Sequence, residues 1–167
     1  MWNFFRKERL SEMTGEIDAR LTALNIELPD APAPAANYVP FVLSGNLVFV
    51  SGQVPWVGGE RNFVGKVGID YTVDEGQDAA RTVALNIIAQ VKAACDGDLD
   101  RVVRCIKLGG FVNCPDNFHQ QPQVINGASD LMVDVFGDAG RHSRFAVGAP
   151  ALPFNVAVEI DAVFEVR

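Results

Sequence analysis

The chain has 167 residues, of which 49% are hydrophobic and 21% are charged, and its net charge is −7. This length suits one domain with a substantial core. The acidic balance argues against a nucleic acid partner, because a phosphate backbone is bound by clustered Lys and Arg. No run of the sequence approaches the roughly 18 apolar residues of a membrane span. We therefore expect neither nucleic acid nor a membrane as a partner.

The cysteines and histidines do not form a recognisable metal or disulfide pattern. The three cysteines never form C-x-x-C, and the two histidines form neither H-x-x-x-H nor H-E-x-x-H. We therefore expect no metal. The opening MWNFFRKERL has basic residues but no long apolar region or small-residue cleavage site after them. These features predict a cytoplasmic protein with reduced thiols.

The first 35 residues are predicted to be an N-terminal extension. Apolar residues recur at helical spacing in TGEIDARLTALNIEL, which predicts a short amphipathic helix. Three prolines follow within six residues, at Pro29, Pro32 and Pro34, and they predict an extended linker. We expect residues 1–35 to be this extension and residues 36–167 to be the main domain.

The domain is predicted to begin with a β-hairpin. Residues 41–55 form two apolar strands around Gly45 and Asn46, which are expected to supply the positive φ angles of a two-residue loop. Residues 56–71 contain four glycines and predict a loop or a short edge strand.

Two helices and three further strands follow. Thr72 and Glu75 form a capping box, which opens a helix of about six turns. RVVRCIKLGGFVN predicts a long strand. Pro122 suits the first turn of a second helix, which FGDAG should end. Two C-terminal strands complete the chain. The apolar stripes are Ala80, Val83, Ala84, Ile87, Val91 and Ala94 on the first helix, and Ile125, Ala128, Met132 and Val135 on the second.

The element order β-β-(β)-α-β-α-β-β predicts a two-layer α+β domain, with two helices packed on one face of a mixed sheet. The last strand alternates, so one set of side chains should lie under the helices and the other should face solvent or a partner subunit. The first set is Val156, Val158, Ile160, Ala162, Phe164 and Val166, and the second is Glu159, Asp161, Val163 and Glu165.

Arg144 is the most unusual residue of this part of the chain, because it lies within the strand-like run HSRFAVG. An arginine keeps its charge, so it must be paired, reach water or hold an anion. The residue pattern alone favours an ion pair with a glutamate on a neighbouring strand, and leaves anion binding open.

Three blocks of the sequence resemble the signature blocks of the RidA/YjgF family. They are GNLVFVSGQVP, VINGASDL and SRFAVGAPALPFNVAVEIDAVFEV, and the match covers roughly residues 36–167. The resemblance implies a chorismate-mutase-like fold, a homotrimer whose sheets pack into a central barrel, and clefts between neighbouring subunits. The N-terminal extension marks a longer branch of the family.

The resemblance also implies an activity and a type of ligand. Family members hydrolyse small reactive enamines and imines, such as 2-aminoacrylate, to 2-keto acids and ammonia. The substrate therefore carries a carboxylate, and the resemblance leads us to expect no metal and no organic cofactor in the reaction. The same resemblance leaves open a non-catalytic trimer that binds 2-keto acids or other small carboxylates. A ribonuclease activity has also been attached to the family, and the acidic charge makes it the weakest alternative here.

The resemblance assigns roles to six residues. Arg144 matches the arginine that binds the substrate carboxylate, and Glu159 matches the glutamate that positions water or a proton. The remaining matches lie around the cleft and contact the substrate: Tyr38, Ser51, Gly52 and Asn126. Ala146 departs from the founding branch, which has a cysteine at this position. This difference leaves the substrate and the activity open.

Overall fold

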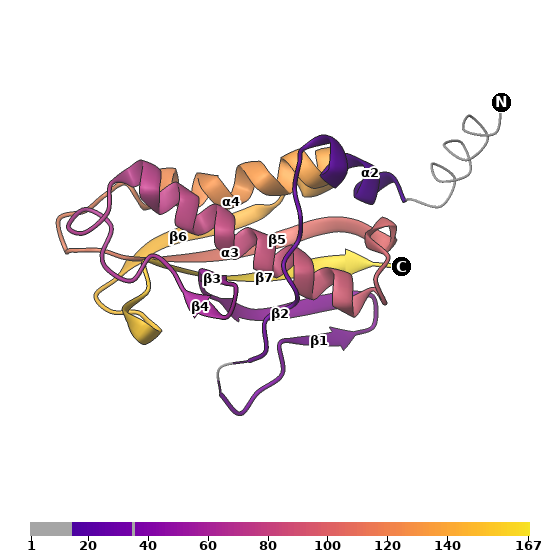
Figure 1. Cartoon of the computed structure of the whole chain (residues 1–167), viewed down its shortest axis with the longest axis horizontal. Coiled ribbons are helices and arrows are strands. Elements are labelled where there is room, and N and C mark those ends of the chain that lie inside the picture. Colours follow the sequence, from indigo (N-terminus) through magenta and orange to yellow (C-terminus); the bar gives the residue numbers. More distant parts are fainter. Residues whose placement is uncertain (1–14, 35) are drawn as a thin grey trace.

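The computed structural model describes residues 15–34 and 36–167 (Figure 1). Residues 1–14 of the predicted extension lie outside the described residues. The helices are α2 (Glu16–Ala23), α3 (Val73–Ala94) and α4 (Gln121–Phe136), with 3-10 turns η1 (Leu99–Arg101), η2 (Gly137–Gly140) and η3 (Pro153–Asn155). The strands are β1 (Phe41–Ser44), β2 (Leu47–Gln53), β3 (Trp56–Val57), β4 (Glu60–Arg61), β5 (Val102–Asn113), β6 (Ser143–Ala149) and β7 (Val158–Val166).

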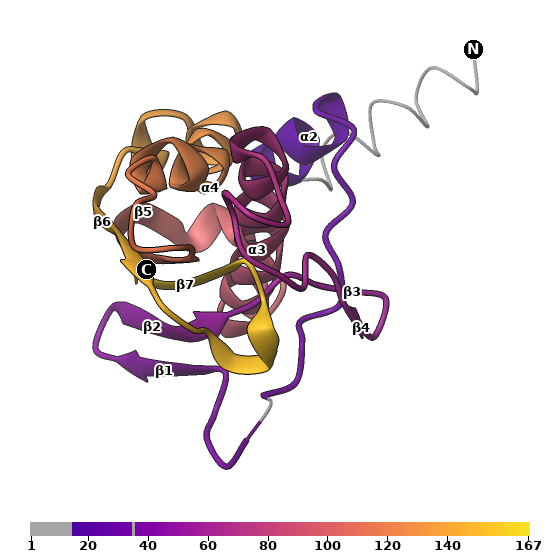
Figure 2. The same ribbon diagram turned by 90° about the vertical axis from the view of Figure 1, so that its left-hand side faces the viewer.

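The main sheet has five strands in the order β1-β2-β7-β5-β6. Strands β5 and β6 are parallel, whereas the other neighbouring pairs are antiparallel. Helices α3 and α4 lie side by side on one face of this sheet (Figure 2). Strands β3 and β4 form a separate two-stranded sheet in the region predicted as a loop or edge strand. The predicted two-layer α+β fold is confirmed.

Local sequence signals account for the two long helices. The Thr72 hydroxyl accepts a hydrogen bond from the Glu75 amide, and the Glu75 carboxylate accepts one from the Thr72 amide. The Thr72 hydroxyl also donates to the Glu75 carboxylate at 2.9 Å. The bonds from the Thr72 amide and hydroxyl to the charged carboxylate lower the pKa of Glu75. Helix α4 has Pro122 in its first turn and ends at Gly137, whose φ is 60°. Both predicted apolar stripes are buried. None of the helices in the described residues is long and apolar enough to cross a membrane.

The first hairpin forms at the predicted place but with a different turn. Gly45 has a φ of 61°, whereas Asn46 is not among the residues with positive φ. The expectation of two positive φ angles was therefore wrong. Glycine at the first central position of a two-residue loop is the pattern of a type II′ turn, which needs only one such residue. The Asn46 side chain instead donates to the Glu165 carboxylate, at 2.9 Å.

The two faces of β7 separate as the alternation predicted. The first set of side chains is buried, and Glu159, Asp161, Val163 and Glu165 lie on the other face. We call this second side of the sheet the open face. It carries apolar residues that are aligned across the strands by their register, namely Val42, Phe49 and Val163 in one row and Phe111 and Val147 in another. Phe49 is 44% exposed and Phe111 is 38% exposed.

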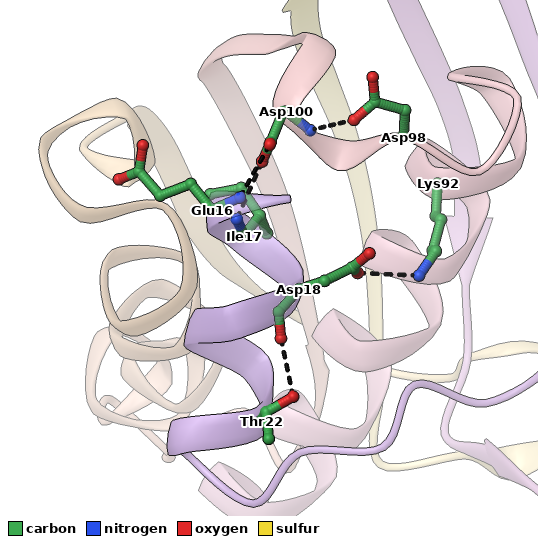
Figure 3. A network of polar contacts seen from close by, with 7 residues as sticks. All are labelled: Glu16, Ile17, Asp18, Thr22, Lys92, Asp98 and Asp100. Atoms are coloured by element: carbon green, nitrogen blue, oxygen red, sulfur yellow. Dashed lines mark hydrogen bonds and ion pairs between the residues drawn. The ribbon is translucent and has the colours of Figure 1, made fainter. Parts of the chain in front are cut away.

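Helix α2 packs against the helical layer (Figure 3). The Asp100 carboxylate accepts hydrogen bonds from the Glu16 and Ile17 amides at 2.8 and 2.9 Å, so it caps a helix that is distant in sequence. Asp18 forms an ion pair with Lys92 on α3 at 3.0 Å. Leu21 is 5% exposed and belongs to the core. Helix α2 is thus docked by polar and apolar contacts together.

Asp100→Ala is expected to lower the free energy of unfolding by about 1 kcal/mol, because two amides at the start of α2 lose their acceptor. Chemical denaturation measures this change. Asp116→Ala is the matched control, since Asp116 is exposed and does not contact α2. Equal stability of the two variants would mean that the docking of α2 does not depend on this cap.

Candidate functional site

A cavity of about 530 Å³ lies where four parts of the chain meet. They are residues 32–34, which we call the proline segment, the end of β2, the β3–β4 hairpin and the η3–β7 region. Three residues that the sequence predicted for the site line it, namely Tyr38, Gly52 and Glu159. The fold therefore brings together groups that are more than one hundred positions apart in the chain.

Glu159 is the ionisable group of this cavity with a shifted pKa. It is half-buried, and this burial raises the pKa of its carboxyl, to which the negative charge of Asp161 adds. A Cβ atom on Gly52 would overlap the Glu159 carboxylate. Glycine at this position is therefore what allows the carboxylate to lie against β2. A carboxyl group that holds its proton more tightly than usual suits a general acid or base.

Ser51 lies next to Gly52, but its hydroxyl has a structural partner. It donates to the carbonyl of Val39 at 2.7 Å, and the Ser51 amide donates to the carbonyl of Pro40 at 2.9 Å. These bonds hold the chain that follows Tyr38 against β2. Tyr38 itself is 46% exposed at the edge of the cavity. In this chain Ser51 thus fixes the segment next to Tyr38 rather than lining the cavity.

Arg144 lies on the other side of the sheet. On β6 it is paired with Leu108, which is fully buried under the helices. Its Nη1 donates to the Ser129 hydroxyl at 2.9 Å and its Nη2 donates to the Pro122 carbonyl at 3.0 Å. Asn126 lies between these two partners on α4, one turn after Pro122. Arg144 and Asn126 therefore form a second group, separate from the Glu159 cavity within one chain.

The positions of Glu159 and Arg144 exclude the cross-strand ion pair that the residue pattern favoured. Glu159 is aligned with Phe111 on the open face, whereas Arg144 faces α4. Among the described residues, the partners of Arg144 are uncharged. Since a guanidinium has five N–H donors, these two bonds orient it and leave further donors for an anion.

His142 extends the group around Arg144. Its Nδ1 lies 2.6 Å from the Gly140 carbonyl, and its Nε2 lies 3.0 Å from the Ser129 hydroxyl. A carbonyl only accepts, so Nδ1 carries a proton, and in the neutral ring Nε2 accepts the Ser129 proton. The Ser129 oxygen then accepts from Arg144. No local pattern in the sequence indicates this chain of contacts, because its members meet only when β6 packs beside α4.

The cysteines are not candidates for a nucleophile. All three are buried. Burial raises the pKa of Cys105 to about 12, so its thiol stays protonated at neutral pH. Ala146, which stands at the position of the founding branch's cysteine, packs against the core.

A family model described as "YjgF/chorismate_mutase-like, putative endoribonuclease" matches residues 18–165. The chain belongs to the YjgF family. The resemblance seen in the three sequence blocks is thereby confirmed. The matched range of the YjgF model begins within α2.

Individual relatives support this membership. Protein TCP17 of Trypanosoma cruzi is 51% identical over 157 residues, which cover 92% of this chain and 96% of that protein. The crystal structure of Atu1372 from Agrobacterium tumefaciens is similar with a TM-score of 0.85 and 52% identity, covering 90% of this chain and 92% of the other. The YjgF protein of E. coli has a TM-score of 0.60 and 26% identity, covering 83% and 94%.

Several residues that line the cavity of this YjgF-family chain were missed by sequence reasoning. Trp56, Arg61 and Phe154 line it, with Pro32 and Pro34 of the segment predicted as a linker. In the sequence, Arg61 has no adjacent aromatic residue that would mark it as part of a site. Only the tertiary contacts of η3 and of the proline segment place these residues beside Glu159.

Proposed function

We propose that this protein hydrolyses reactive enamines and imines of the 2-aminoacrylate type to 2-keto acids and ammonia. The observation that carries the proposal is the half-buried Glu159, whose pKa is raised, in a cavity shared with Tyr38 and Gly52. The second support is Arg144, whose charge is oriented by uncharged partners and is free to bind a carboxylate.

The chemistry needs no covalent enzyme intermediate. An enamine first tautomerises to the imine, and water then attacks the C=N carbon. Glu159 would take a proton from that water as the C–O bond forms and return it to the nitrogen, which gives a carbinolamine. Glu159 would then take the hydroxyl proton and pass it to the amine as the C=O bond forms and the C–N bond breaks, so that ammonia and the keto acid are released. Arg144 would hold the substrate carboxylate by two parallel hydrogen bonds and fix the position of the reacting carbon.

The two groups lie on opposite sides of the sheet in one chain, so a shared site needs a second copy. We propose a homotrimer in which Arg144 and Asn126 of one subunit face the Glu159 cavity of its neighbour. The exposed apolar rows of the open face support this assembly, because burying them against other copies removes apolar surface from water.

Sedimentation at micromolar concentration is expected to show three chains, and a mixture of two inactive variants tests the shared site. Co-expressed Arg144→Ala and Glu159→Gln subunits should recover about a quarter of the parent activity, since random assembly makes about a quarter of the clefts intact. A monomer, or a mixed trimer without recovery, would contradict the shared site.

The assay of the activity itself uses 2-aminoacrylate made in situ by a serine dehydratase. The protein should accelerate pyruvate release above the spontaneous rate. If it binds pyruvate but gives no acceleration, it is the non-catalytic binder instead, which Arg144 would serve equally well. A ribonuclease activity is disfavoured by the net charge of −7.

A further inference from the structure

The cavity around Glu159 is large for a substrate with a three-carbon skeleton. Its volume of about 530 Å³ lies within the range of about 300–1,000 Å³ found for pockets that enclose drug-sized ligands. Most of the residues around it are apolar, including Pro32, Pro34, Trp56 and Phe154. A substrate as small as 2-aminoacrylate would leave much of this apolar wall without a contact.

The wall is held in place by two buried amides of α3. Gln90 is 1% exposed, and its Nε2 donates to the Pro32 carbonyl at 2.6 Å. Asn86, one turn earlier and also 1% exposed, donates to the carbonyls of Val54 and Trp56 at 3.0 and 3.1 Å. These bonds tie the proline segment and β3 to a rigid helix, so the wall is preformed.

The aromatic part of the wall depends on an unusual turn. Phe154 and Asn155 have φ angles of 57° and 56°, a left-handed conformation that is uncommon outside glycine. Asn113 donates to the Asn155 side chain at 3.1 Å and stabilises this turn. The turn places the centroid of the Phe154 ring 3.7 Å from the guanidinium carbon of Arg61. The same carbon lies 5.5 Å from the centroid of the Trp56 ring. Strained residues of this kind persist where a site needs them.

We propose that the substrates of this protein are 2-imino acids with a large apolar or aromatic side chain, which binds against Trp56, Phe154 and the proline segment. The inference rests on the proposed function and names its substrate class. The reacting end would lie at Glu159, and the side chain would fill the apolar remainder of the cavity. Trp56 and Phe154 would thus determine specificity.

The experiment compares imines made in situ by an amino acid oxidase from phenylalanine, leucine, alanine and glutamate, with loss of semicarbazide trapping as the readout. We expect kcat/KM for the phenylalanine imine to exceed that for the alanine imine at least about tenfold. Trp56→Ala should lower this ratio about tenfold. Ile69→Ala is the control, because Ile69 is exposed and outside this cavity, and it should leave the ratio unchanged.

Calorimetric binding of phenylpyruvate and pyruvate separates the two proposals. If no imine is hydrolysed but phenylpyruvate binds about tenfold more tightly than pyruvate, the proposed function fails and the inferred ligand class stands. Preference for the alanine imine overturns the inference and leaves the function intact. Preference for the glutamate imine also overturns it, because Arg61 would then bind a second carboxylate. If Trp56→Ala leaves the ratio of kcat/KM for the phenylalanine and alanine imines unchanged, the apolar wall does not determine specificity and the inference is overturned.

Discussion

Glu159→Gln is expected to slow turnover of 2-aminoacrylate about a hundredfold or more, while the binding of 2-keto acids changes little. Glutamine has nearly the same shape as glutamate, but its amide cannot take a proton from water. Pyruvate release measures the rate, and calorimetry measures binding. Glu165→Gln is the matched control, since Glu165 lies on the same face of β7 and outside the cavity. If Glu159→Gln turns over like the parent, Glu159 is not the base.

The same residue sets an expected pH dependence. The pKa of Glu159 is raised from 4.5 by burial and by Asp161, so the rate should fall on acidification with a midpoint above 4.5. Because the folded state binds this proton more tightly than the unfolded chain, the contribution of Glu159 to stability is present at low pH and is lost as pH rises through the raised pKa. Glu159→Gln should therefore raise the melting temperature at neutral pH.

Asp161→Asn tests the second cause of this shift. Removing the neighbouring charge should move the acid limb of the rate profile to lower pH, because burial alone would then raise the pKa of Glu159. Arg61 and Tyr38, which also line the cavity, are unchanged in this variant. An acid limb at the same pH would mean that the limb reports another group.

Arg144→Lys is expected to weaken 2-keto acid binding and to lower the deaminase rate at least about tenfold, or roughly 1.4 kcal/mol. Lysine keeps the charge, but its ammonium lacks the planar fork that binds a carboxylate by two parallel bonds while other N–H groups donate to Ser129 and Pro122. Arg144→Ala should cost more. Binding is measured by calorimetry, and trimer formation and the melting temperature should be unchanged in Arg144→Lys.

Arg141→Lys is the control for this change, since Arg141 is an exposed arginine that pairs with Asp138 three residues earlier. An exposed pair of this kind contributes about 0–1 kcal/mol, so its replacement should have little effect. If Arg144→Lys behaves like the parent as well, Arg144 serves only to hold β6 to α4.

Signals that act within one element predicted the fold well. The capping box at Thr72, the stripe of α3 and the alternation of β7 each depend on residues a few positions apart, and the structure contains all three. Strand β6 could be predicted only in part from such local signals. Alternation along the strand puts Arg144 and Phe145 on opposite faces of the sheet, but which face each side chain occupies depends on the pairing of β6 with β5.

The candidate site was predictable only where the family resemblance applied. Gly52 and Glu159 come from different blocks, Tyr38 precedes the first block, and all three meet in one cavity. The apolar wall was not predictable, because the turn at Phe154 depends on Asn113 and the proline segment depends on Gln90. These contacts join residues more than forty positions apart, which a local pattern does not reveal.

Helix α3 holds the N-terminal segment at two points, through the ion pair of Lys92 with Asp18 and the bond of Gln90 to Pro32. The two attachment points are fixed on one rigid helix, so the length of chain between them is constrained. A deletion that leaves the chain too short to reach from Ala23 to Pro32 would break one attachment, whereas exposed side chains such as Leu24 can vary. In homologues that keep both attachments, we therefore expect this stretch to vary in sequence while keeping its minimum length.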